Sequence, residues 1–349
     1  LMAPTEALAK QHYQSFKTLF PYIKCALLTS NTKDKKHIKE QLKEQDIEFI
    51  IGTQALLAED VNFKQLGLTI IDEQHKFGVS TRNELSDKSK QTDIIYLTAT
   101  PIPRSMAMAY YGHLTYSIIK EKPSYQKPVI TTLQSTTNIN QVLKQIKHNS
   151  QKKEQTYVVV PAIYEKNLAY SIESVYELLK DHIASEHLYQ LHSKLKPQEQ
   201  ETMMQDFLND TQGVLLATTM IEVGIDCKNA TLMVILGAEY FGLSQLHQLR
   251  GRVGRGSLQS YCVMVSEKTD IERLNMMTNT TDGFELSQVD LKLRGPGDLL
   301  GDEQSGFIKY EFIDLASDDL LIKQAAHDAL KYYQQLDKYP YLYKKISTM

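Results

Sequence analysis

The sequence predicts an α/β protein with two domains built on parallel sheets, followed by a helical region. Short apolar runs alternate with amphipathic segments over the first part of the chain, and the same alternation starts again after the stretch 120–131. Strands that alternate with helices are typical of βαβ units, whose strands pair in parallel. Beyond residue 267 the strand-like runs stop and helical patterns continue.

The composition is that of an ordinary globular protein. The chain has 349 residues, of which 42% are hydrophobic, and a net charge of -3, which excludes a wholly basic nucleic-acid coat and leaves any DNA contact local. No apolar run reaches membrane-spanning length. The three cysteines (Cys25, Cys227, Cys262) lie far apart, which favours a reducing compartment over a disulfide framework or zinc site. We therefore expect a cytoplasmic location.

The first α/β region is expected over 1–119. The opening residues LMAPT resemble the end of a buried strand that runs into a helix over 6–19, with Thr5 as its cap. A chain that begins inside a strand is expected to be part of a longer protein. Further elements are predicted as strands at 26–29, 49–52, 68–71 and 94–97, with a helix at 37–43.

The stretch 120–131 contains two prolines and few bulky apolar groups, which indicates a linker. A second α/β region is expected over 132–266. Its predicted strands are 157–161, 187–191, 213–217, 232–236 and 261–265, and its predicted helices are 172–182 and 197–208. The final region, 267–349, is predicted to contain helices at 270–277, 286–293 and 315–336 around a glycine-rich loop at 295–306.

Two adjacent carboxylates, Asp72 and Glu73, come directly after a buried apolar run. Ligands of parallel sheets lie beyond the carboxyl ends of the strands. One carboxylate can hold Mg²⁺ and the other can orient or deprotonate an attacking water. For an acidic pair alone, a helix cap would be the better explanation. Thr98 and Thr100 follow the next strand, and we expect their hydroxyls to bond back to the acidic loop.

The segment QLRGRVGRG at 248–256 presents three arginines (Arg250, Arg252, Arg255) on a glycine-spaced turn. A guanidinium fork matches phosphate oxygens two at a time, and glycines permit close approach of the backbone. A generic basic loop is the alternative. A nucleotide-hydrolysing site has arginines that bind the triphosphate and carboxylates that hold its magnesium. The two segments therefore supply two of the parts that such a site needs.

The third part of such a site would be a G-x-x-x-x-G-K-[ST] loop, which cradles the phosphates, and the 349 residues contain none. We therefore expect this chain alone to be inactive as an ATPase. Another segment, TTMIEVGID at 218–226, follows a predicted strand. Its threonines could contact a nucleic-acid backbone and Asp226 a ribose hydroxyl, although alone it would pass as an ordinary turn.

Several motifs occur in the order found in superfamily-two helicases: MAPTEALAKQHY, GTQALL, DEQHKFGV, LTATPIPRSMAM, ATTMIEVGIDCKNATLMVI, FGLSQLHQLRGRVGRG and LRGPGDLLGDEQSG. Together they resemble the RecG family of bacterial ATP-dependent helicases, and the resemblance covers nearly the whole chain. Mfd-like transcription-repair coupling translocases share most of these motifs. His75, His247 and Pro296 favour the RecG family, and a PriA-like helicase would lack the terminal loop.

The resemblance implies two RecA-like domains that use ATP and Mg²⁺. Asp72 and Glu73 would serve Mg²⁺ and water activation, and Arg252 and Arg255 would be arginine fingers. The remaining implied roles are coupling (His75, Gln248, Thr98, Thr100, Arg273, Arg294, Gln304), nucleotide binding (Gly224, Asp226) and DNA-backbone binding (Pro4, Thr5, Thr53, Gln54, Thr218, Thr219).

The family's activity implies that the protein remodels forks and Holliday junctions in recombination and repair. The resemblance also implies a monomer that acts on branched double-stranded DNA. Single-stranded-DNA-binding protein would be a further partner. A non-enzymatic DNA- or partner-binding scaffold is the rival of another class. The sequence departs from the family in lacking the phosphate-binding loop, in having Asp302 and Glu303 where a basic residue is usual before Gln304, and in having Lys76 for the commoner arginine.

Overall fold

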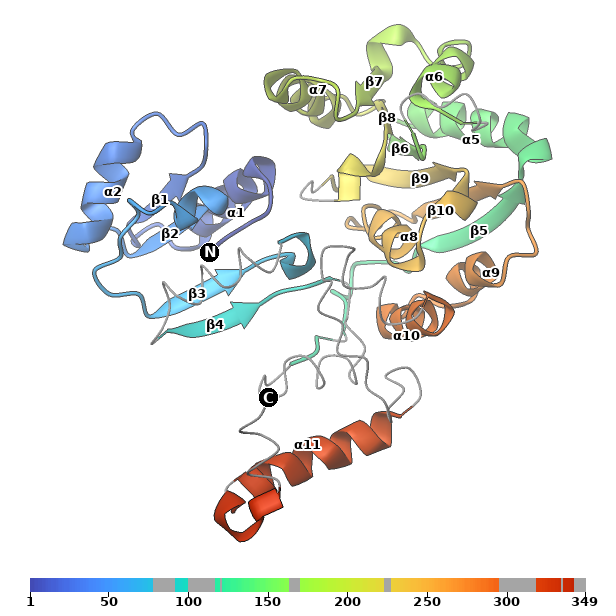
Figure 1. The fold of residues 1–349 in the computed structure, drawn as a ribbon. Helices are drawn as coiled ribbons and strands as arrows, with labels where there is room; N and C mark the ends of the chain where they lie inside the picture. Colours follow the sequence, from blue (N-terminus) through green and yellow to red (C-terminus); the bar gives the residue numbers. More distant parts are fainter. Residues whose placement is uncertain are drawn as a thin grey trace. The chain divides into compact units, whose positions relative to one another are not determined.

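The computed structural model describes residues 1–77, 92–99, 117–119, 121–162, 170–222, 227–294, 318–333 and 335–341. The chain divides into two compact units, Leu1–Ala99 with Pro123–Thr281 and Thr100–Lys122 with Asp282–Met349. The first unit contains two separate parallel sheets (Figure 1).

The first sheet is built around the opening residues of the chain. Strand β1 (Cys25–Leu28) pairs in parallel with β2 (Phe49–Gly52), and β3 (Leu68–Ile71) pairs in parallel with β4 (Asp93–Tyr96). Met2 makes parallel bridges to both Gly52 and Ile71. The first residues therefore form a short strand segment between β2 and β3, as the sequence predicted.

Helix α1 (Glu6–Leu19) begins and ends where the sequence predicted. The Oγ1 atom of Thr5 accepts a hydrogen bond from the backbone N–H of Leu8 at 3.3 Å, which is an N-cap. Leu8 and Ala9 pack with Ile51 of β2 in one small core. The other elements of this sheet region are α2 (Lys35–Glu44) and the short 3-10 helices η1 (Gln54–Leu57) and η2 (Gln74–Lys76).

The second sheet has six parallel strands in the order β5-β10-β9-β6-β8-β7. These are β5 (Ile130–Ser135), β6 (Gln155–Val159), β7 (Leu188–Leu191), β8 (Val214–Ala217), β9 (Ala230–Leu236) and β10 (Tyr261–Ser266). Every residue of β6, β8 and β9 is buried, as expected of a parallel sheet covered on both faces. The edge strand β5 begins inside the stretch predicted as a linker.

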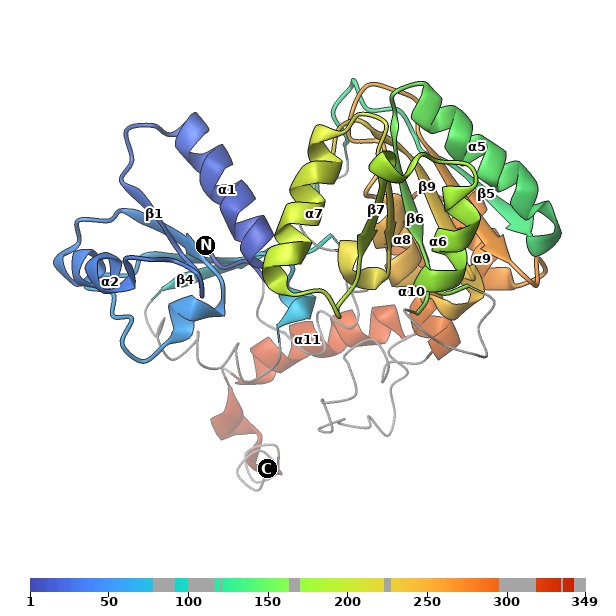
Figure 2. The same cartoon turned by 90° about the horizontal axis from the view of Figure 1, so that it is seen from above.

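Five helices accompany this sheet: α5 (Ile139–Gln151), α6 (Ile172–Lys180), α7 (Pro197–Asn209), α8 (Leu243–Arg250) and α9 (Glu272–Asn279). Helices α5 and α6 share one core with alternate strand residues such as Val158 and Leu216. On the other face, the ring of Phe207 from α7 lies against the ring of Tyr157, with ring centroids 5.3 Å apart. Figure 2 shows α5 and α6 along one side of the sheet and α7 along the other. Short 3-10 helices are η3 (Thr136–Asn138), η4 (Ser185–His187), η5 (Thr219–Glu222) and η6 (Ala238–Tyr240).

The second unit contributes α10 (Gly283–Arg294), α11 (Asp319–Tyr333) and the 3-10 helix η7 (Leu336–Lys338). All three lie in the region that the sequence predicted to be helical. The rings of Tyr332 and Tyr339 meet edge to face with centroids 4.9 Å apart, which fastens η7 to the end of α11. Among the described residues, no helix combines the length and the apolar character needed to cross a membrane.

Candidate nucleotide and nucleic-acid site

The carboxylate pair lies at the carboxyl end of β3, where the sequence placed it. The backbone N–H of Asp72 donates to the carbonyl of Met2 at 2.9 Å, and that of Gln74 donates to the carbonyl of Leu97 at 3.3 Å. Glu73 has a φ of +49°, a left-handed conformation that is uncommon for residues other than glycine. Strained backbone of this kind persists where the surrounding structure fixes it. The acidic loop is therefore held from both neighbouring strands.

Both oxygens of the Asp72 carboxylate have partners. Oδ1 accepts from the backbone N–H of Glu73 at 2.9 Å, and Oδ2 lies 2.7 Å from Nε2 of His12 on α1. His12 was not among the residues predicted for the site. A signal was present, because residues three and four apart share a helix face, and His12 stands at these spacings from Ala9 and Leu8 on the buried side of α1.

The pKa of Glu73 is raised above the ordinary glutamate value. Burial is the largest cause, and the neighbouring charge of Asp72 adds to it. The positive charges of Arg252 and Lys76 and a backbone hydrogen bond from Ala99 act in the opposite direction. A carboxylate with a raised pKa takes up a proton more readily than an exposed one, which suits the removal of a proton from water.

The residues predicted to touch DNA from the first domain gather at the same sheet edge. Pro4 and Thr5 follow the strand segment at Met2, and Thr53 and Gln54 follow β2. The backbone N–H of Ala3 donates to the carbonyl of Gly52 at 2.9 Å, so the two short segments lie side by side. The Thr5 hydroxyl oxygen is already the cap acceptor of α1.

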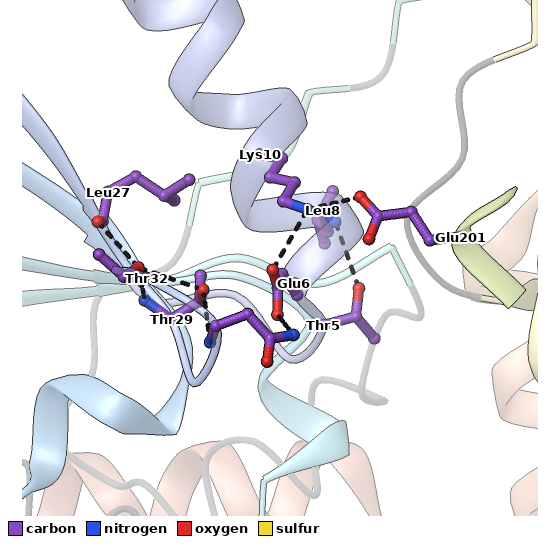
Figure 3. Close-up of polar contacts among 9 residues, drawn as sticks. Thr5, Glu6, Leu8, Lys10, Leu27, Thr29, Thr32 and Glu201 are labelled. Atoms are coloured by element: carbon purple, nitrogen blue, oxygen red, sulfur yellow. Dashed lines mark hydrogen bonds and ion pairs between the residues drawn. The ribbon is translucent and has the colours of Figure 1, made fainter. Parts of the chain in front are cut away.

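A polar network surrounds the start of α1, and it too was missed from sequence (Figure 3). Glu6 accepts from the side-chain amide of Asn31 at 2.8 Å, and Lys10 pairs with both Glu6 and Glu201. The Thr32 hydroxyl accepts from the backbone N–H of Thr29 at 2.9 Å. These contacts order the loop after β1 next to the N-terminus of α1.

Arg250 was predicted to lie on the glycine-spaced turn with the other two arginines, and this was wrong. It is the last residue of α8 and is only 4% exposed. One of its terminal nitrogens, Nη1, donates to the carbonyls of Met277 and Thr280, both at 2.8 Å. Burial lowers its pKa. Arg250 therefore fastens the C-terminal end of α9 to α8 and does not face a phosphate.

Arg252 and Arg255 do lie on the turn. Gly254 has a φ of +78°, and a Cβ atom there would meet Cγ2 of Val129 at 2.7 Å, so the turn requires glycine at this position. Nε of Arg255 donates to the carbonyl of Gly251 at 3.2 Å. The guanidinium of Arg252 is largely buried, and its charge acts on Glu73.

The other predicted site residues are distributed over strand ends and helices. Thr98 follows β4, Thr218 and Thr219 follow β8, and Gln248 lies in α8. The Nη2 atom of Arg273, on α9, donates to the carbonyl of Glu239. Thr100, Gly224, Asp226 and Gln304 lie outside the described residues, as do the side chains of His75 and Arg294.

Comparisons with known families cover most of the chain. The family described as DEAD/DEAH box helicase matches residues 1–109, and the helicase conserved C-terminal domain matches residues 137–257. A third family, described as ATP-dependent DNA helicase RecG, domain 3, C-terminal, matches residues 280–341. This last match covers the region predicted to hold the coupling helices.

Curated relatives agree with these matches. The ATP-dependent DNA helicase RecG of Staphylococcus aureus is 43% identical over 343 residues, which is 96% of this chain and 50% of that protein. The chain belongs to the RecG family. The RecG of Streptococcus pneumoniae is 42% identical over 333 residues, 93% of this chain and 50% of that protein. The chain thus spans about half the length of the curated RecG proteins it matches.

A solved structure, described as RecG bound to a three-way DNA junction, matches with a TM-score of 0.73 and 40% identity, covering 92% of this chain and 43% of that chain. The structure of the Mycobacterium smegmatis helicase Lhr bound to single-stranded DNA and AMP-PNP matches with a TM-score of 0.60 at 16% identity, over 80% of this chain and 42% of that chain. The second likeness shows the fold alone. The predicted architecture, two RecA-like helicase domains with parallel sheets and a helical C-terminal part, is confirmed, and the RecG matches do not favour the Mfd-like and scaffold alternatives.

Proposed function

We propose that this chain is the motor part of an ATP-dependent DNA helicase that remodels branched DNA. The observation that carries the proposal is the pair Asp72 and Glu73, fixed at the carboxyl edge of the first sheet, with the charge of Arg252 from the turn after α8 acting on Glu73. In enzymes that hydrolyse nucleoside triphosphates, the nucleotide lies between carboxylates that serve its magnesium and arginines that bind its phosphates. The electrostatic interaction of Glu73 with Arg252 fits this arrangement.

The carboxylate pair fits Mg²⁺ bound mostly through water and phosphate. Carboxylate oxygens are the hard donors that this ion prefers, and it is usually held by one or two carboxylates without a full protein cage. When bound, Mg²⁺ would neutralise charge on the phosphates.

The chain's own residues would then divide the work of hydrolysis. Asp72 would hold the ion through water, and Glu73 would orient the attacking water and accept its proton, which its raised pKa favours. Arg252 and Arg255 would stabilise negative charge on the transferred phosphoryl group, because their donors match its oxygens.

The DNA substrate is proposed to lie along the carboxyl edges of the sheets. Backbone phosphates accept hydrogen bonds from hydroxyls and backbone N–H groups without regard to sequence. Thr5, Thr53, Gln54 and the threonines after β8 present such groups. Pro4 has no N–H or hydroxyl to donate, so its proposed part is contact with the DNA backbone next to Thr5. Forks and Holliday junctions are proposed as substrates because the chain resembles, at 40% identity, a RecG solved on a three-way junction.

The test is ATP turnover by the full-length protein with and without a model fork, followed by unwinding of the fork against a Holliday junction. We expect turnover that DNA stimulates and that Asp72→Asn reduces about 10-fold or more, the lower range for loss of a group that acts on a bound metal through its outer shell. An Asp72→Asn protein with wild-type turnover would refute the assigned role of the carboxylate pair.

The chain of 349 residues alone is proposed to be inactive, because the β- and γ-phosphates need a cradle of N–H groups and a lysine that it does not contain. DNA-stimulated turnover by the chain alone would contradict this. We further propose that the protein acts as a monomer with single-stranded-DNA-binding protein as a partner. Light scattering and a binding assay with that protein test these two statements.

A further inference from the structure

A histidine that the proposed mechanism does not use touches the carboxylate expected to serve the metal. Nε2 of His12 lies 2.7 Å from Oδ2 of Asp72, across 60 residues of sequence. An ionised carboxylate only accepts hydrogen bonds, so the hydrogen belongs to the histidine ring. The other carboxylate oxygen is tied to the backbone N–H of Glu73 at 2.9 Å.

We infer that His12 is a positioning residue, which fixes the rotation of the Asp72 carboxylate so that its remaining lone pairs face the site of Mg²⁺. This inference rests on the proposed function. Each oxygen of an ionised carboxylate can accept more than one hydrogen bond, so one bond to His12 and one to Glu73 leave acceptors for the water shell of the ion. Hydrogen bonds that orient a ligating carboxylate commonly set metal affinity.

A purely structural role, in which His12 merely fastens α1 to the sheet, is the competing explanation. Helix α1 already has other attachments. Thr5 caps it, Leu8 and Ala9 are buried, and the ring of Phe16 stacks on that of Phe49 with centroids 4.1 Å apart. Loss of the imidazole is therefore expected to leave α1 in place while the carboxylate rotates.

The placement of His12 also gives α1 a second role. Thr5, a predicted DNA-backbone contact, caps the helix, and His12 lies seven residues further on, about two turns along the same helix. One rigid element thus joins the proposed DNA edge to the metal-serving carboxylate. A displacement of α1 by DNA would move the hydrogen-bond donor of Asp72.

The experiment compares His12→Leu with His12→Gln in the full-length protein. The side-chain amide of glutamine can place an N–H near the position of Nε2, whereas leucine offers no donor. The measurement is binding of Mn²⁺ in the presence of ADP, followed by electron paramagnetic resonance, together with the MgCl₂ dependence of ADP binding. We expect His12→Leu to weaken metal binding about 10-fold, the lower range for loss of such a partner, and His12→Gln to restore most of it.

A matched control comes from the second sheet region. Nδ1 of His187 lies 2.7 Å from Oδ2 of Asp210, and the side-chain exposures of the pair, 26% and 15%, are close to the 31% and 18% of His12 and Asp72. His187→Leu breaks an equivalent contact away from the carboxylate pair, and we expect it to lower thermal stability without changing Mn²⁺ binding.

The outcomes separate this inference from the proposed function. Wild-type metal binding by His12→Leu, or equal losses in the leucine and glutamine variants, would overturn the positioning role. A fall in melting temperature alone would overturn it as well, in favour of the structural role. If Asp72→Asn also binds Mn²⁺ and ADP as the wild type does, then the proposed function of the carboxylate pair fails with it.

Discussion

At the scale of single residues, Arg252 contributes geometry as well as charge. A lysine in its place would keep the positive charge near Glu73 but would lose the planar fork that binds two phosphate oxygens. We expect Arg252→Lys to lower kcat for ATP in the full-length protein about 1000-fold, the lower range for an arginine finger, with little change in the affinity for ADP. Steady-state turnover and ADP binding check this, and an unchanged kcat would remove Arg252 from the site.

The ionised side chain of Glu73 lowers the stability of the folded protein. Its raised pKa means that the folded state disfavours the charged form at neutral pH, chiefly through burial and the adjacent Asp72. Glu73→Gln removes that charge. We therefore expect a higher melting temperature at pH 7 together with a loss of ATP turnover of at least 100-fold.

A matched substitution controls for glutamine itself. Glu59 is exposed, so Glu59→Gln should leave the melting temperature and the rate of ATP turnover unchanged. The measurements are thermal unfolding and ATP turnover of Glu73→Gln and Glu59→Gln. A Glu73→Gln protein that melts below the wild type would contradict the stated cost.

At the scale of elements, the turn that carries Arg252 and Arg255 depends on one glycine. Gly254→Ala would place a Cβ atom 2.7 Å from Val129 in a left-handed conformation. That conformation alone costs about 1–2 kcal/mol for a residue with a Cβ atom, so we expect at least this loss in the free energy of unfolding by urea. Gly67→Ala is the control, because nothing lies within 4 Å of its added atom and its φ is not positive. Equal stability of the two variants would contradict this account.

Sequence pattern predicted most strands because burial on both faces makes them continuous apolar runs, as in β8 and β9. It missed β5, an edge strand whose sequence ITTLQS has only two apolar residues, Ile130 and Leu133, and follows a proline-containing stretch. It also missed α8, in which eight residues are too few for a clear helical period. Such elements are specified by pairing and packing with distant parts of the chain.

Some features of the candidate site could likewise be predicted from the sequence, and others could not. Asp72 and Glu73 could be placed from sequence because they directly follow a strand, and parallel strands end at one edge. The helix period places His12 on the buried side of α1, but its contact with Asp72 joins residues 60 positions apart, and no local pattern predicts that partner. The different roles of Arg250 and Arg252 likewise depend on the carbonyls at the end of α9, which only the folded chain brings near.

At the scale of the whole molecule, the two sheets have separate hydrophobic cores. Ile71 of β3 belongs to a core formed by the first sheet region, and Ile235 lies in the centre of the second sheet; both are fully buried. Replacing either isoleucine by alanine is expected to cost about 2–5 kcal/mol. Because each cavity lies in a different core, Ile71→Ala should speed amide exchange mainly in the first sheet and Ile235→Ala mainly in the second. Hydrogen-exchange mass spectrometry checks this, and uniform acceleration across both sheets in either variant would show that they open as one unit.

The buried Arg250 has a consequence for genetics. Substitutions of the three arginines are expected to fall into two kinds, although all three stand within six residues. Changes at Arg252 or Arg255 should abolish activity at every temperature while the protein persists in the cell. Changes at Arg250 should release the carbonyls of Met277 and Thr280, so that the protein is active at low temperature and is lost to proteolysis at high temperature.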